Sequence, residues 1–91
     1  MEKVICNFSL FDMEQTIYIL TEENGTTNYK AIGKCNLDEL GKTLADVCFA
    51  NNIDSIHLYG HAQYIDDILH DIDLYSGCSA YSNGMIKVEV N

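Results

Sequence analysis

The 91-residue chain contains no arginine, no proline and no tryptophan, and its only fixed cations are five lysines. Without arginine it lacks the planar guanidinium fork that binds phosphate in two places, which disfavours nucleic-acid reading and phosphoryl transfer. Lysine is also missing from residues 43–86, almost half the chain. The formal net charge is −9. A surface of this sign repels nucleic acid and anionic lipid and attracts basic protein or metal.

The cysteines and the N-terminus indicate a cytoplasmic protein. The four cysteines form no CxxC pair, and the chain opens directly on a strand-like pattern with no signal peptide. No apolar run approaches the ~20 residues of a transmembrane helix. We therefore expect reduced thiols that behave as small hydrophobic side chains. These are Cys6, Cys35, Cys48 and Cys78.

Apolar–polar alternation in two segments, with a β-branched and aromatic segment between them, predicts an antiparallel meander in the first third of the chain. The expected strands cover residues 3–11, 16–21 and 26–35. Asn24-Gly25 connects the second and third strands, because both residues tolerate positive φ in a hairpin turn. The first strand is expected to bury one side, made of Val4, Cys6, Phe8 and Leu10.

The spacing of apolar residues becomes helical after residue 35. Asn36 with Glu39 predicts a capping box at the start of the first helix, and Asn51-Asn52 is expected to end it. A short strand over 54–60 precedes a second helix that follows Gly60. The apolar stripe of that helix is Tyr64, Ile65, Ile68, Leu69 and Ile72.

The end of the chain is less regular. Residues 74–84 show no clear period and are rich in Ser, Gly and Tyr. Ten or more residues exceed the usual connection in a compact domain, so this segment is either a functional loop or a continuation of the helix. Residues 85–90 predict a last strand with Ile86, Val88 and Val90 directed inward.

Together these elements predict a single α+β domain over residues 1–91. The order is β-β-β-α-β-α-β, with a mixed five-stranded sheet and two helices. This order resembles the ribonuclease H-like fold in reduced form, although ferredoxin-like and other α+β sandwiches accommodate similar strings.

Nucleases of the ribonuclease H-like type hold two metal ions with carboxylates from the middle of the first strand and the end of the fourth. Here these places hold Asn7 and Tyr59-Gly60-His61, so the resemblance implies the fold and argues against nuclease activity. Phe11 to Glu14 contains no glycine and two acids, unlike the phosphate loop of the related actin-like ATPases. We expect no enzyme activity, no metal site and no cofactor.

Two other sequence features fall short of a reactive site. His57 and His61 are separated by strand residues and Gly60, so they are not expected to share one side as a metal pair. Cys78 has no nearby cation to activate its thiol.

The remaining candidate site is a negative strip with aromatic edges on the second helix. Tyrosine is enriched at protein interfaces, although an acidic helix face is often only a solvated surface. We predict that this strip binds a partner. It consists of Asp66, Asp67, Asp71, Asp73, Tyr64, Tyr75 and Tyr81.

Small acidic proteins without arginine resemble those of bacteriophages and mobile elements, including anti-CRISPR inhibitors. We therefore expect a non-enzymatic protein-binding module. It would act as a phage-type inhibitor or nucleic-acid mimic that occupies a basic groove of a nucleic-acid-handling host protein, without binding nucleic acid or membrane itself. The alternative is a structural or self-associating accessory domain, a homodimer paired through its last strand. A third possibility is an enzyme or small-ligand binder that uses residues 74–84.

Overall fold

The computed structural model of the chain describes residues 2–60, 62–78 and 87–90. The predicted order β-β-β-α-β-α-β is confirmed, with one short 3-10 turn, η1, before the first helix. The elements are β1 (Glu2–Asn7), β2 (Glu14–Glu23), β3 (Thr26–Asn36), η1 (Leu37–Glu39), α1 (Leu40–Asn51), β4 (Ser55–Tyr59), α2 (Ala62–Cys78) and β5 (Lys87–Val90).

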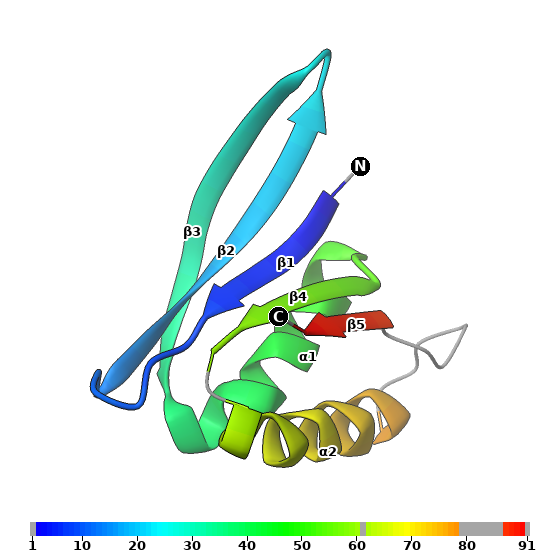
Figure 1. Cartoon of the computed structure of the whole chain (residues 1–91). Coiled ribbons are helices and arrows are strands. Elements are labelled where there is room, and N and C mark those ends of the chain that lie inside the picture. The colour runs from blue at the N-terminus through cyan, green and yellow to red at the C-terminus, as the bar shows by residue number, and fades with distance from the viewer. Residues whose placement is uncertain (1, 61, 79–86, 91) are drawn as a thin grey trace.

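The strands form one mixed sheet in the order β3-β2-β1-β4-β5 (Figure 1). The three N-terminal strands pair antiparallel, whereas β4 pairs parallel with both β1 and β5. Parallel neighbours need a long crossover, which α1 and α2 provide. Asn24 and Gly25 take positive φ values of 52° and 77° at the β2–β3 turn, as the sequence predicts.

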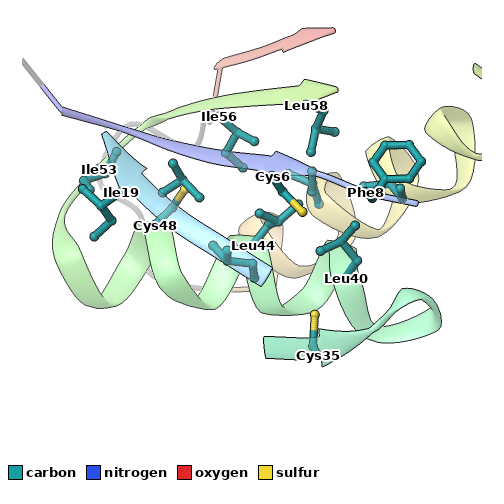
Figure 2. Close-up of a cluster of buried hydrophobic side chains, with 14 of the residues drawn as sticks. Cys6, Phe8, Ile19, Cys35, Leu40, Leu44, Cys48, Ile53, Ile56 and Leu58 are labelled. Atoms are coloured by element: carbon teal, nitrogen blue, oxygen red, sulfur yellow. The ribbon is translucent and has the colours of Figure 1, made fainter. Parts of the chain in front are cut away.

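Both helices lie on the same face of the sheet, and the core fills the space between the two layers (Figures 1 and 2). Alternate residues of β1, β2 and β4 point toward α1 and α2 because side chains alternate between the two faces of a strand. Burying each large aliphatic side chain stabilises the fold by about 1.5–3 kcal/mol. The largest fully buried apolar side chains are Val4, Cys6, Ile17, Leu40, Leu44, Cys48, Ile56, Leu58 and Ile72.

The termini of several elements differ from the sequence prediction. β1 ends at Asn7, so Leu10 lies outside the strand and is 37% exposed. Asn36 makes no side-chain capping bond, since η1 stands between it and α1. Asn52 does close α1, with a left-handed φ of 56°.

The second helix is longer than its apolar stripe. It continues to Cys78, so the first part of the irregular 74–84 segment is helical, and the rest lies outside the described residues. Within the described part of the chain, no helix is long and apolar enough to span a membrane. In β5, Val88 and Val90 pair with the core residues Ile56 and Leu58 and so point toward the helices, as expected, although Val90 is 39% exposed on this edge strand. Ile86 lies outside the described residues.

Candidate functional site

A groove of about 640 Å³ opens where three segments of the chain meet. The segments are the loop between β1 and β2, the η1 turn and the first half of α2. These segments are far apart in sequence, so the tertiary structure alone brings them together. The lining residues are Leu10, Asp12, Met13, Asn36, Leu37, Asp38, Tyr64, Asp67, Ile68 and Asp71.

Four of the lining residues are carboxylates, and none is a cation. Asp12, Asp38, Asp67 and Asp71 come from all three segments. Leu37 and Ile68 supply an apolar lining between these carboxylates, and both residues pack against the hydrophobic core. An apolar lining ringed by negative charge suits a basic side chain, because the aliphatic stem and the charged head of lysine or arginine require different surroundings.

Gln15 holds the loop that forms one wall of the groove. Its side chain is almost fully buried, at 2% exposure, and bonds to the backbone at both ends of the loop. Oε1 accepts from the Ser9 N–H at 2.8 Å, while Nε2 donates to the carbonyls of Ser9 at 2.8 Å and Asp12 at 3.0 Å. A carboxamide carries both a donor and an acceptor, so it can satisfy both kinds of backbone group.

The opposite wall depends on how closely α1 and α2 approach. At Gly41 an added Cβ would lie 2.5 Å from the Cβ of Asp71 and 2.9 Å from the carbonyl oxygen of Ile68. Glycine is therefore required at this crossing for steric reasons, although its φ is ordinary. The close contact fixes the α2 residues that face the groove.

The structure divides the predicted acidic strip between two sides of α2. Tyr64, Asp67 and Asp71 line the groove, and Tyr64 is 38% exposed. Asp66 and Asp73, seven residues apart, share another side of the helix, about 140° and 160° around the axis from Asp71. Tyr75 lies within α2, but its side chain, like those of residues 62, 63 and 76–78, is not described. Tyr81 lies outside the described residues.

The sequence prediction missed the part of the groove formed outside α2. Asp12 was expected only in a connection, and Asp38 only in a helix cap. One signal was present in the sequence: Leu10, Phe11 and Met13 gather three large apolar residues at the end of the expected first strand and just after it. Phe11 and Met13 are 97% and 89% exposed, beside the groove.

Asn7 and Tyr59, the residues compared with the metal-binding carboxylates of nucleases of this fold, lie on the other face of the sheet, and Asn7 is the last residue of β1 rather than its middle. Asn7 of β1 pairs with Tyr59 of β4 in parallel register. The Tyr59 ring stacks on His57, with the ring centres 4.4 Å apart. His57 Nδ1 lies 3.7 Å from a Glu89 oxygen, and its Nε2 has no hydrogen-bond partner among the described residues. The described part of the chain holds no group of three or more His, Cys, Asp or Glu able to bind a metal.

The three cysteines whose side chains are described are buried and reduced. Burial raises the pKa of Cys6 and of Cys48 from 9.0 to about 12, with a smaller contribution from the Cys35 thiol near Cys6 and from the Asp54 carboxylate near Cys48. Burial also raises the pKa of Cys35. The neutral thiols serve as core side chains, as expected from the sequence.

The chain matches no known protein-family model and no curated protein sequence. Among solved structures it is similar to the crystal structure of the Fowlpox virus resolvase with its substrate Holliday junction DNA, with a TM-score of 0.60 and 19% identity. The alignment covers 100% of this chain and 60% of that chain, so this protein spans about three fifths of the resolvase's length. At this identity the likeness shows the fold alone, which is the ribonuclease H-like fold that the order of elements predicts.

Proposed function

We propose that this protein is a non-enzymatic, acidic protein-binding module that acts in the cytoplasm. Its acidic groove binds a basic surface of a host protein that handles nucleic acid, in the manner of a phage-type inhibitor. The observation that supports this is the convergence of four carboxylates, without a cation, on one groove with an apolar lining.

The chemistry of the groove favours a lysine or arginine side chain. Asp38, Asp67 and Asp71 offer oxygen acceptors for the charged head, and a charge-assisted bond is about twice as strong as a neutral one. Leu37 and Ile68 contact the aliphatic stem. Proteins that handle nucleic acid present such basic side chains in their binding grooves, so occupying them would block the nucleic acid.

The resemblance to nucleases does not lead us to propose a nuclease. Such enzymes carry metal-binding carboxylates in the middle of the first strand and at the end of the fourth. Here β1 has no acid after Glu2 and ends at Asn7, which stands beside Tyr59 at the end of β4. A carboxamide and a phenol bind hard divalent cations poorly compared with paired carboxylates. This supports a binding role over catalysis.

A short fluorescent peptide of alternating arginine and leucine serves as a probe for the groove. We expect its fluorescence polarisation to rise on binding and the affinity to fall steeply as NaCl is raised. In backbone amide NMR spectra, the shifts should concentrate on residues 10–13, 37–38 and 64–71. Replacing Asp67 and Asp71 together with Asn should weaken binding at least about tenfold, or about 1.4 kcal/mol.

The matched control is the double change Asp66→Asn with Asp73→Asn, which removes the same charge from the other side of the same helix. This variant should keep its affinity within about threefold. If both double variants reduce the affinity for the probe equally, binding depends on the net charge of the chain, and the groove is not the binding site.

A second experiment tests the identity of the partner class. A host protein that the wild-type chain retains from lysate should not be retained by the Asp67→Asn/Asp71→Asn variant. Added DNA or RNA that carries the host protein's own binding site should release it from the wild-type chain. Retention that nucleic acid leaves unchanged would remove the mimic part of the proposal.

A further inference from the structure

The sheet has a second face, opposite the helices, that none of the described residues covers with a helix or a strand (Figure 1). We call it the open sheet face. Because Val4, Cys6 and their paired residues point toward the helices, the residues between them point the other way. The register joins Ile5 to Tyr18 and to His57, Asn7 to Tyr59, and Leu20 to Tyr29.

The centre of the open sheet face is aromatic, uncharged and hollowed. A hollow of about 350 Å³ is lined by Ile5, Asn7, Tyr18, Tyr29 and Tyr59. Ile5 is only 9% exposed, although none of the described helices covers it. Tyr29 is the most exposed of the three tyrosines, at 64%, against 36% for Tyr18. The face therefore presents a hollow whose lining includes an exposed tyrosine ring.

The charge of the molecule is concentrated on the helix side. Residues 37–54 and 62–78 carry eight acids and one lysine, a net charge of −7. By strand register and alternation, the open sheet face carries three lysines and three glutamates, a net charge of zero. They are Lys3, Lys34, Lys87, Glu14, Glu22 and Glu89.

From this separation of charge we infer that the open sheet face binds a second copy of the chain, as a two-fold symmetric dimer. Two helix sides repel each other, whereas two neutral faces do not, and lysines and glutamates on one face can pair across a two-fold axis. Tyr29, which lines the hollow of each copy, packs against the hollow of the other. Tyrosine suits this position because it brings a large rigid contact area with a polar tip.

This inference goes beyond the proposed function and is independent of it. The acidic groove lies among the loop, η1 and α2, away from the open sheet face, so both copies keep their grooves accessible. A dimer would present two grooves to a partner. Failure of either proposal leaves the other standing, because the two surfaces share no lining residue.

Light scattering and sedimentation of the full chain over a range of concentrations test the dimer. We expect a mass that approaches twice 10.2 kDa as concentration rises. Tyr29→Glu and Tyr18→Glu should each weaken the dimer at least about tenfold, while circular dichroism shows an intact fold. Tyr18 belongs to the interior strand β2. A weaker dimer in the Tyr18 variant would therefore indicate contact between the sheet faces rather than pairing of the β3 edge strands. Leu74→Glu, at an exposed apolar position on α2, is the control and should leave the dimer unchanged.

The dependence on salt concentration distinguishes binding at the open sheet face from binding at the acidic groove. Between about 50 and about 300 mM NaCl, where the Debye length falls by more than half, the dimer constant should change less than threefold. Binding of the basic probe to the groove should fall steeply over the same range. A mass of 10.2 kDa at every concentration, or a dimer that both tyrosine variants leave intact, would overturn the inference. A monomer would leave the hollow to a small ligand or to another protein.

Discussion

Gly41 of α1 lies against Asp71 of α2 with no room for a side chain between them. An added Cβ at residue 41 would lie 2.5 Å from the Asp71 Cβ. The contact joins the packing of the helix layer to the groove, since Asp71 is one of its four carboxylates. A change at a buried glycine is therefore expected to alter a binding surface.

The substitution Gly41→Ala should destabilise the fold by about 1–3 kcal/mol, because α1 and α2 must move apart to admit the methyl group. Chemical denaturation measures the loss, and binding of the basic probe should weaken as Asp71 shifts. Gly33→Ala is the matched control, because an added Cβ there meets nothing within 4 Å. Because alanine favours a helix more than glycine does, a Gly41→Ala variant no less stable than the wild type would show that the crossing has room for the methyl group.

Gln15→Glu should loosen the β1–β2 loop while nearly preserving side-chain size. A carboxylate cannot donate, so the carbonyls of Ser9 and Asp12 lose the donor that Nε2 provides. We expect a loss of about 2 kcal/mol in the free energy of unfolding and faster amide hydrogen exchange in residues 9–13. Unchanged exchange in that loop would show that its own backbone holds it in place.

Removing the apolar side chains of the loop should affect binding more than folding. Phe11 and Met13 are 97% and 89% exposed, so Phe11→Ser with Met13→Ser should change the free energy of unfolding by less than about 0.5 kcal/mol per site. The same double variant should bind the arginine–leucine probe more weakly, because the leucine side chains of the probe lose their contacts with the loop. Wild-type affinity would exclude the loop from the binding surface.

Alkaline pH should destabilise the protein through its buried thiols. Burial raises the pKa of Cys6 and of Cys48 to about 12, whereas the unfolded thiols titrate near 9.0. The unfolded state therefore releases protons first, and stability falls from about pH 9 to about pH 12. The slope is up to about 1.4 kcal/mol per pH unit for each thiol.

Denaturation midpoints at a series of pH values test this prediction. Cys48→Ala should be less stable than the wild type below about pH 9 because of the cavity it leaves, but its loss of stability with rising pH should be shallower than that of the wild type. Parallel slopes would mean that the Cys48 thiol does not govern the alkaline loss.

The sequence determined the order of elements and most of the core. Several local patterns carried this prediction: the alternation in β1, the β-branched and aromatic residues of β2, the Asn24-Gly25 turn, and the helical spacing of Leu40, Leu44 and Cys48. Each can be recognised within a few residues, because side-chain direction repeats every two residues in a strand and about every 3.6 in a helix. The same reasoning supplied the ribonuclease H-like topology.

Tertiary structure decided where the charge lies and which acids act together. Asp12, Asp38 and Asp71 are separated by dozens of residues, and only the crossing at Gly41 and the bonds of Gln15 bring their segments to one groove. The opposite is true of Asp66 and Asp67, which are neighbours in sequence but differ by about 100° around α2. Local patterns predict how a segment folds. A site made from three segments depends on how they pack, which no single segment encodes.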